Sequence, residues 1–298
     1  MSELLAQFSQ ALVETVAAAG QSVVRVEGRD RLPGSGVVWS ADGLIVTAAH
    51  VLERDTVRVG LPDGQSVAAR VVGRDAGVDV AVVQAEAGGL KPAEWAAPAT
   101  LEVGALVLAL GRPGERGLAT LGVISALEEG WRTPAGGFID RYLQTDVVMF
   151  PGFSGGPLVD AEARVAGLTS STLARGLSVA VTVDTVRQTV AALVKHGRVR
   201  RGYLGIGAQP VRLPEALRPA TGQAGGLLLM NVEPGGPAER GGLLQGDTLV
   251  TLDGRPVPSL ESLLAALGED RVGRRVPAQI VRAGQLQALE VWVGERPA

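Results

Sequence analysis

The chain has 298 residues, a formal net charge of −3, no cysteine and two histidines. This length exceeds what a single hydrophobic core usually serves, so two or three packed units are expected. The composition excludes disulfides and thiolate or multi-histidine zinc sites, and the weak negative charge argues against nucleic-acid binding. We therefore expect neither a metal nor a cofactor.

Residues 1–21 predict an amphipathic helix, because apolar side chains recur there at helical spacing. These are Leu4, Leu5, Phe8, Leu12, Val13 and Val16. No lysine or arginine opens the segment, and Gln7, Gln10 and Glu14 interrupt it, so the pattern is typical of neither an export signal nor a membrane span. On this ground we expect a cytoplasmic protein. A location in the cell envelope or periplasm stays open for a chain trimmed at its N-terminus.

Forty-one glycines, and short apolar runs separated by turns, predict a chain built mostly of strands. A first set is expected at residues 23–26, 36–39, 44–47, 56–60, 66–73 and 80–84. A second set is expected at residues 105–110, 118–127, 142–144, 157–159, 165–169 and 177–181. The polar, glycine-rich segment 128–139 is predicted to be a loop, and a helix follows the last strand and runs to Lys195.

Residues 151–158 read PGFSGGPL and point to an exposed nucleophile. Glycines on both sides of Ser154 permit backbone angles that a Cβ forbids, so consecutive N–H groups can turn toward a developing oxyanion. A serine hydroxyl is a poor nucleophile on its own. It needs a base beside it, and the chain offers only two histidines.

His50 is the candidate base. It ends the stretch Thr47-Ala48-Ala49-His50 after an apolar run, which places it at the mouth of a strand rather than inside a core. His196 stands between Lys195 and Gly197, where a helix is expected to end. A basic residue before a glycine is what a helix C-terminus favours, so His196 is interpreted as a capping residue.

A third group must accept a hydrogen bond from the imidazole's other nitrogen and fix its tautomer. Asp79 is the candidate, because it begins a β-branched apolar run in which a carboxylate is partly buried and needs a partner. Asp75 and Asp63 lie in polar, glycine-bearing segments and are better explained as turn residues.

The order of these residues along the chain separates three folds. Residues 152–156 also satisfy G-x-S-x-G, the nucleophile elbow of α/β-hydrolases. That fold needs serine, acid and then histidine, with a helix directly after the serine, whereas residues 157–168 predict a strand, a turn and a strand. Subtilisin-like enzymes need the acid before the histidine. The order His50, Asp79, Ser154 is that of chymotrypsin.

At these residues the chain resembles the HtrA/Deg-type family of trypsin-like, PDZ-containing serine proteases. The resemblance covers nearly the whole chain from about Ser22 onward. The matching stretches are residues 34–38, 43–51, 79–82, 121–126, 144–146, 151–158 and 203–206. It implies a mostly β fold, with a chymotrypsin-like double β-barrel followed by a C-terminal α+β PDZ domain. The implied domains are a protease at 22–196, a hinge at 197–201 and the PDZ domain at 202–298.

The resemblance also implies roles for individual residues. His50 is the general base, Asp79 orients it, and Ser154 is the nucleophile. The N–H groups of Gly152 and Ser154 form the oxyanion hole. The family usually has asparagine just before the serine, whereas this chain has Phe153. Because the backbone donors do not depend on that side chain, catalysis is expected, although the ring can change how readily the loop takes its active shape.

The substrate pocket is assigned by the same resemblance. Its expected lining is Met149, Ser178, Val179, Ala180 and Val181. None of these residues is acidic, so we expect cleavage after small or medium aliphatic residues rather than after lysine or arginine. The family further implies that segment 128–139 belongs to an activation domain, and that N-terminal segments assemble homotrimers. The N-terminal helix is therefore expected either to dock on its own barrel or to contact another subunit through Phe8.

The C-terminal third has the pattern of a PDZ unit. Strands are expected at residues 226–232, 247–252, 277–281 and 288–293, with a hairpin turn at Asp253-Gly254 and a helix at 260–267 capped by Ser259. Such domains add a ligand strand and capture its terminal carboxylate on backbone N–H groups. The expected peptide-binding residues are Tyr203, Leu204, Gly205 and Ile206, with Ser262, Leu263 and Ala266 on the helix.

The sequence thus predicts a serine endopeptidase that degrades unfolded or misfolded proteins. Its expected partners are unfolded protein substrates, a C-terminal peptide at the PDZ domain and copies of itself. Two other functions stay open: a catalytically weak peptide-binding scaffold, and a chaperone-type holdase for unfolded chains.

Overall fold

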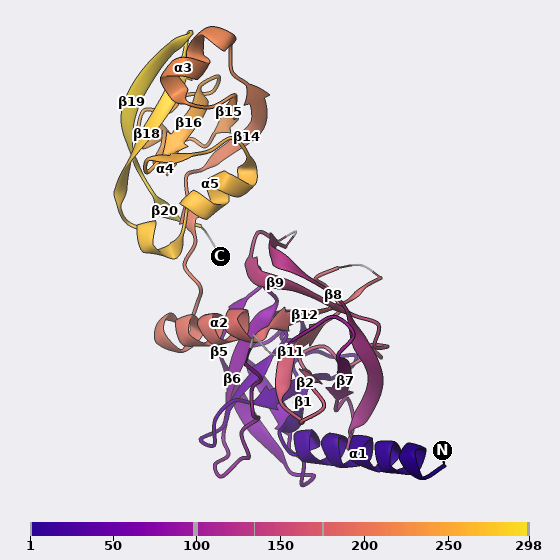
Figure 1. Cartoon of the computed structure of the whole chain (residues 1–298). Helices are drawn as coiled ribbons and strands as arrows, with labels where there is room; N and C mark the ends of the chain where they lie inside the picture. The colour runs from indigo at the N-terminus through magenta and orange to yellow at the C-terminus, as the bar shows by residue number, and fades with distance from the viewer. Residues whose placement is uncertain (1, 98–100, 134, 175, 297–298) are drawn as a thin grey trace. The chain divides into compact units, whose positions relative to one another are not determined.

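The computed structural model describes residues 2–97, 101–133, 135–174 and 176–296, shown in Figure 1. The chain divides into two compact units, Met1–Val199 and Arg200–Ala298. The first unit contains two closed six-stranded barrels, and the second contains an antiparallel sheet with short helices. The expected fold class, a chymotrypsin-like double barrel followed by a PDZ domain, is confirmed.

The first barrel closes in the order β1-β2-β3-β6-β5-β4. Its strands are β1 Val23–Glu27, β2 Gly34–Val38, β3 Leu44–Thr47, β4 Thr56–Gly60, β5 Ser66–Asp75 and β6 Val80–Ala85. Valine dominates them, and its branched side chain packs well on a pleated surface. In β6 the alternation sends Ala81 and Val83 into the barrel, while Val80 and Val82 face the core shared with the second barrel.

The second barrel closes in the order β10-β11-β12-β9-β8-β7. Its strands are β7 Leu106–Gly111, β8 Leu118–Arg132, β9 Phe138–Thr145, β10 Pro157–Val159, β11 Val165–Ser170 and β12 Ser178–Thr182. Phe153 lies in its interior and is among the largest fully buried side chains of the chain. Another cluster, with Val82 from the first barrel and Leu168 from the second, joins the two barrels. The loop that carries Ser154 (the serine loop) and the turn that carries His50 (the histidine turn) therefore both sit on the double barrel.

The prediction of a loop at residues 128–139 is wrong over most of its length. Strand β8 continues to Arg132 and pairs with β9 from Phe138, so that Trp131 lies opposite Ile139. Trp131 packs edge-on against Tyr142, with ring centroids 5.5 Å apart, and the Arg132 guanidinium lies 5.5 Å from the Phe138 centroid. Such cross-strand pairs stabilise a hairpin whose sequence is polar.

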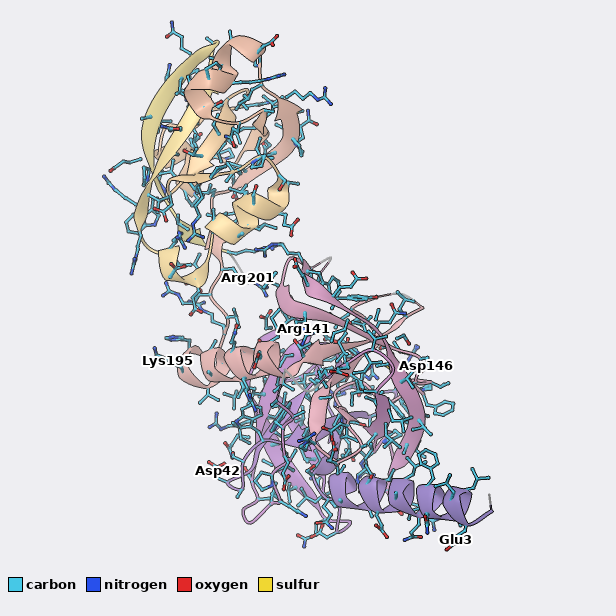
Figure 2. All side chains as sticks on the ribbon, in the orientation of Figure 1. Glu3, Asp42, Arg141, Asp146, Lys195 and Arg201 are labelled. Carbon is cyan, nitrogen blue, oxygen red and sulfur yellow. The ribbon has the colours of Figure 1, made fainter. Side chains whose placement is uncertain are left out.

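Helix α1 (Ser2–Gly20) packs on the first unit with only part of its apolar surface. Leu12 and Val16 lie against the core between the barrels, whereas Leu4 is 70% exposed and Phe8 is 42% exposed. Figure 2 shows Glu3 at the outer end of this helix. The part of the helix that packs on the barrels agrees with the expectation that it docks on its own barrel. The expected subunit contact through Phe8 stays a prediction.

Helix α2 (Val183–His196) follows β12 and covers β5 and β6. Val186, Val190 and Leu193 are buried on its inner face. It ends at Gly197, which has a φ of 71° and donates its N–H to the Leu193 carbonyl. His196 lies exposed in the last turn, beside Lys195, which Figure 2 labels. This is the arrangement expected of a helix C-terminus.

The second unit contains a six-stranded sheet, in which β14-β15-β16-β18-β19 follow in order and β17 pairs with β16, and a two-stranded sheet of β13 and β20. The strands are β13 Gly202–Tyr203, β14 Ile206–Arg212, β15 Gly225–Val232, β16 Thr248–Leu252, β17 Arg255–Pro256, β18 Arg275–Arg282, β19 Gln285–Trp292 and β20 Gly294–Glu295. The helices are α3 Arg218–Thr221, α4 Pro237–Arg240 and α5 Leu260–Ala266, with 3₁₀ turns η3 Glu215–Leu217 and η4 Glu269–Arg271.

Two negative observations apply to the described ranges. No helix there combines the length and the apolar character that crossing a bilayer requires. Within the same ranges, no three histidine, cysteine, aspartate or glutamate side chains are grouped so as to hold a metal ion.

Candidate active site

His50 lies in the short 3₁₀ turn η1 (Ala49–Val51), which begins two residues after the end of strand β3. The strand end is fixed by the Thr47 hydroxyl, which donates to the Ser35 carbonyl at 2.6 Å. The turn is fixed by the Ala49 N–H, which donates to the Asp79 carbonyl at 3.2 Å. These two hydrogen bonds hold the imidazole at the mouth of the first barrel, next to the start of β6.

Asp79 precedes β6 and is buried, with 4% of its surface exposed. Its φ of 57° lies in the left-handed region, which aspartate tolerates better than most residues with a Cβ. The carboxylate faces the histidine. The His50 Nδ1 atom lies 2.8 Å from Asp79 Oδ2, and the His50 backbone N–H donates to Oδ1 at 3.0 Å. The expected acid–imidazole pair is therefore present in the structure.

Two hydroxyl groups also donate to the Asp79 carboxylate. Ser170 and Thr172 both contact Oδ2, the latter at 3.0 Å. Burial raises the pKa of the Asp79 carboxyl, but the hydrogen bonds and positive charge of His50 and the Ser170 hydroxyl outweigh it. The net effect holds this pKa below its ordinary value. An ionised Asp79 favours the neutral tautomer of His50 that carries its proton on Nδ1, which leaves Nε2 with its lone pair.

Ser154 follows a tight turn that the sequence specifies closely. The Phe153 N–H donates to the Phe150 carbonyl at 3.0 Å, with Pro151 and Gly152 as the central residues. Proline at the first central position and a φ of 90° at Gly152 are the features of a type II turn. The Gly152 carbonyl accepts from the Ser35 hydroxyl at 2.7 Å, which fixes the peptide plane that precedes Phe153.

Phe153 explains how this chain accommodates an aromatic residue beside the nucleophile. Its ring is fully buried in the second barrel and packs edge-on against Phe150, with centroids 5.9 Å apart. Gly111 makes the space, because a Cβ on that glycine would lie 2.6 Å from the Phe153 ring. The ring thus belongs to the core below the turn, and it stabilises the turn rather than obstructing the side that faces His50.

The serine loop lies against the strand end that leads to His50. A Cβ on Gly155 would lie 2.4 Å from the Thr47 hydroxyl oxygen and 2.7 Å from the Ala48 nitrogen. The Ser35 N–H donates to the Ser154 carbonyl at 2.9 Å. Ser154 is therefore adjacent to the histidine turn, although its residues are more than a hundred positions away in the sequence.

The Ser154 hydroxyl does not bond to His50 in this structure. Its Oγ lies 3.0 Å from the Ser171 hydroxyl oxygen and accepts from the Ser171 N–H at 3.3 Å. Among the described residues, no hydrogen bond joins Ser154 to His50. The structure therefore joins Asp79 and His50, and places Ser154 nearby with a different partner.

The sequence patterns did not point to residues 169–172, which read TSST and contact both Asp79 and the serine loop. Thr169 donates to the carbonyls of Phe153 and Gly156, at 2.8 and 3.0 Å. Ser35 was likewise not selected. A run of four hydroxyl residues was visible in the sequence, but such residues are common in turns, and only the fold brings them to the site.

The Gly152→Ala substitution is expected to reduce kcat/KM by about 100- to 1000-fold, the cost of losing one oxyanion donor. A Cβ at this position would lie 2.4 Å from Pro113 Cβ, and the φ of 90° disfavours any side chain. Steady-state turnover of a chromogenic peptide checks this. Gly64→Ala is the control, since Gly64 also has a positive φ but has open space around it. Equal turnover of Gly152→Ala and Gly64→Ala would contradict the assignment.

The residues expected to line the substrate pocket fall into two groups. Val179 and Val181 point into the core between the barrels and are fully buried. Met149 and Ala180 belong to the cluster inside the second barrel that also holds Phe153. Ser178 is half-buried and donates to the Val147 carbonyl at 2.8 Å. Because side chains alternate along β12, Val179 and Val181 face away from Ala180.

Comparison with known proteins identifies both units. The description "trypsin-like peptidase domain" matches residues 34–168, and the description "PDZ domain" matches residues 202–293. A probable periplasmic serine endoprotease DegP-like from Halomonas elongata is 36% identical over 271 residues, 89% of this chain and 56% of the relative. The chain belongs to the HtrA/Deg-type family of serine endoproteases. The family predicted from the sequence is therefore confirmed.

Other HtrA/Deg-type relatives agree with this assignment. The DegP-like protein of Chlamydia muridarum is 32% identical over 281 residues, 92% of this chain and 56% of the relative. The serine endoprotease from Yersinia pestis superposes with a TM-score of 0.78 at 29% identity, covering 95% of this chain and 97% of that one. The HtrA-type protease AlgW with a decapeptide gives a TM-score of 0.78 at 27% identity, covering 95% and 98%.

The chain spans about half the length of the curated HtrA/Deg-type relatives it matches, 56% of each of those described. Their names place them in the periplasm. These relatives thus give no support to the expected cytoplasmic location, and they agree with the open alternative of the periplasm.

In the PDZ unit, the segment predicted to bind a carboxylate lies before the edge strand β14. The Leu204 and Gly205 carbonyls accept from the N–H groups of Ala238 and Glu233, each at 2.8 Å. Within the described part of the chain, no hydrogen bond from the Leu204 or Gly205 N–H is present. Tyr203 donates its hydroxyl to the Glu233 carboxylate, and burial adds to this bond in raising the pKa of Tyr203.

The helix residues predicted to face a PDZ ligand are engaged in the fold. Ser262 completes a capping box: its hydroxyl accepts from the Ser259 N–H at 3.0 Å, and its own N–H donates to the Ser259 hydroxyl at 3.1 Å. Leu263 and Ala266 are 4% and 1% exposed in the core of the unit. Ile206, the first residue of β14, is half-buried against that core.

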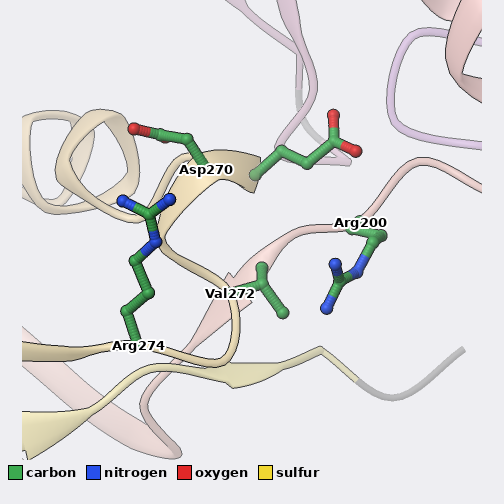
Figure 3. A pocket seen from close by; sticks show the side chains of 5 residues that line it. Arg200, Asp270, Val272 and Arg274 are labelled. Atoms are coloured by element: carbon green, nitrogen blue, oxygen red, sulfur yellow. The ribbon is translucent and has the colours of Figure 1, made fainter.

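A shallow pocket on the second unit is lined by charged residues from two segments (Figure 3). The lining residues are Arg200, Glu269, Asp270, Val272 and Arg274. Asp270 pairs with Arg271 at 2.8 Å, and Arg200 pairs with Glu295 at 3.2 Å. Its charged groups carry both signs, and two of them are paired with neighbours, so we assign it no binding role.

Proposed function

We propose that this chain is a serine endopeptidase that cleaves unfolded proteins through an acyl-enzyme. In this reaction His50 removes the proton from Ser154, whose Oγ attacks the scissile carbonyl. Asp79 holds the imidazole and stabilises its charged form. The observation that carries the proposal is the 2.8 Å contact between His50 Nδ1 and a buried, ionised Asp79. That contact leaves the other imidazole nitrogen as a base beside the serine loop.

The oxyanion hole is proposed to consist of the Gly152 and Ser154 N–H groups. The type II turn supports this, because a positive φ at Gly152 is a conformation in which successive N–H groups can converge on one point. The Phe153 carbonyl, which shares a peptide plane with the Ser154 N–H, accepts from the Thr169 hydroxyl at 2.8 Å, so this donor is held before the reaction begins. Donors held in this way need no reorganisation when negative charge develops.

Substrate selection is proposed to rest on an apolar pocket bounded by Met149, Ser178 and Ala180, with Val179 and Val181 forming the core behind it. No acidic side chain stands among these residues, so cleavage is proposed after small or medium aliphatic residues.

The exposed edge of β14 and the free N–H groups before it support binding of a C-terminal peptide at the PDZ unit. The relatives' names support a periplasmic location, and the exposed half of α1 supports a homotrimer.

The test is digestion of an unfolded, casein-type protein, with the fragment ends identified by mass spectrometry. Fragments that end in valine, alanine or other small aliphatic residues support the endopeptidase. An intact substrate, together with retained binding of a C-terminal peptide, supports the scaffold instead. Suppressed aggregation of the substrate without fragments supports the holdase.

The Glu233→Gln substitution is expected to tighten binding of a peptide with a free C-terminal carboxylate by about two- to ten-fold. The Glu233 carboxylate lies 2.9 Å from the position of a Cβ on Gly205, so a bound carboxylate would meet a like charge near an exposed site. Fluorescence anisotropy with a labelled peptide measures the change. The amidated form of the same peptide is the control and is expected to bind both proteins equally. An unchanged Kd for the free-acid peptide would contradict the expectation.

A further inference from the structure

Residues 169–172 form a continuous run of hydroxyl side chains at the end of β11, which we call the hydroxyl run. Their contacts alternate as side chains do along an extended backbone. The second and fourth residues, Ser170 and Thr172, reach the Asp79 carboxylate. The first and third reach the serine loop, and Ser171 contacts the nucleophile itself. One short segment therefore touches both the acid and the nucleophile of the proposed triad.

Either direction of the Ser171–Ser154 hydrogen bond competes with catalysis. A serine hydroxyl has one proton and two lone pairs. If Ser154 donates to Ser171, its proton is not available to His50. If Ser154 accepts from the Ser171 hydroxyl as well as from the Ser171 N–H at 3.3 Å, the electron pairs that would attack the substrate are engaged. In both cases the hydroxyl must leave Ser171 before it can react.

We propose that Ser171 is a positioning residue that holds Ser154 in a resting conformation, away from His50. The inference rests on the proposed function. A hydrogen bond between two neutral hydroxyls shifts an equilibrium by about two- to ten-fold, so the reactive fraction is lowered by that factor. Thr172 acts in the opposite sense, because its bond at 3.0 Å stabilises the ionised Asp79 on which the base depends.

The experiment uses diisopropyl fluorophosphate and measures its second-order rate constant with the full chain. In this reaction Ser154 Oγ bonds to phosphorus, fluoride leaves, and His50 takes the hydroxyl proton. No pocket for a peptide is needed, so the rate reports on the nucleophile. Ser171→Ala is expected to react about two- to ten-fold faster than the wild type. Ser171→Thr, which keeps the hydroxyl, is expected to react at the wild-type rate.

Three further variants make the outcome decisive. Thr172→Val loses a neighbouring hydroxyl but keeps the Ser171 bond, so it is expected to react no faster than the wild type. Ser40→Ala removes a hydroxyl that bonds, within the part of the chain that the structure describes, only to the exposed Asp42, and it is expected to leave the rate unchanged. Thermal melting establishes that each variant is folded. A Ser171→Ala rate equal to or below that of the wild type, or a Ser171→Thr rate as high as that of Ser171→Ala, overturns the inference.

Failure of this inference is distinguishable from failure of the proposed function. If Ser154 is labelled in the wild type and Ser154→Ala is not labelled, the nucleophile stands whatever Ser171→Ala does. If the folded wild type and Ser171→Ala are both unreactive at Ser154, both proposals fail. Labelling of Ser171→Ala alone is the strongest result in favour of the resting conformation.

Discussion

Ser154→Ala is expected to lower kcat/KM for an unfolded protein substrate by about 10⁴- to 10⁶-fold, the range found when a triad nucleophile is removed. The substitution deletes one oxygen from a buried residue and leaves its loop supported by Ser35 and Gly155, so the fold should survive. Initial rates with a casein-type substrate measure the loss, and thermal melting verifies folding.

The control for this prediction is binding by the PDZ unit. Because Ser154 lies in the first unit, Ser154→Ala should bind a C-terminal peptide with the wild-type Kd. Loss of cleavage with retained peptide binding is the pattern of a protease. Equal cleavage by the wild type and Ser154→Ala would contradict the assignment of the nucleophile.

Asp79→Asn is expected to lower kcat by about 10⁴-fold at neutral pH, because an amide can hold His50 in the wrong tautomer. The asparagine NH₂ group can donate to Nδ1, which forces the imidazole proton onto Nε2 and removes the base. Steady-state kinetics measure the loss. Asp63→Asn is the matched control, since the Asp63 side chain is exposed and, among the described residues, bonds only to the Gln65 N–H. Similar turnover of the two variants would contradict the role of Asp79.

The lowered pKa of Asp79 also predicts how stability depends on pH. The ionised carboxylate is favoured in the folded state relative to the unfolded chain, whose aspartate pKa is about 3.9. This stabilisation is present above that pKa and is lost as the pH falls through the lower folded value. The Tm advantage of the wild type over Asp79→Asn should therefore shrink as the pH falls below about 3.9, and an advantage that grows on acidification would be inconsistent with it.

Local signals in the sequence predicted the conformation correctly where it depends on neighbouring residues. The Asp253-Gly254 pair was predicted to form a hairpin turn, and both residues have positive φ, 51° and 71°, between β16 and β17. Ser259 was predicted to cap the following helix, and it does so in a capping box. In each case the residues that decide the conformation lie within three positions of one another.

Prediction was weaker where the structure depends on partners distant in the chain. Segment 128–139 has the composition of a loop, but cross-strand contacts such as Trp131 with Tyr142 extend it into a hairpin. Phe153 could not be interpreted from its neighbours, because the space for its ring is made by Gly111, forty-two positions earlier. The contacts of Ser171 and Thr172 were also invisible, since a hydroxyl carries no signal of which distant group it meets.

The candidate site contains residues that the sequence indicated and residues whose contacts depend on distant partners. The three residue types and their order indicated His50, Asp79 and Ser154 because few other residues can perform these roles. The assignment of helix residues to the PDZ ligand rested only on their position in the expected helix. Ser262, whose hydroxyl serves the helix cap, illustrates how a side chain can match a pattern and still be occupied by its own backbone.

A double-mutant cycle tests whether His50 and Ser154 act as one catalytic unit. We would measure kcat/KM for His50→Ala, Ser154→Ala and the double variant, with His196→Ala as the control histidine. We expect each single variant to lose nearly all activity and the double variant to lose no more, because the effects of residues that act together are not additive. Losses that multiply in the double variant, or full activity in His50→Ala, would contradict it.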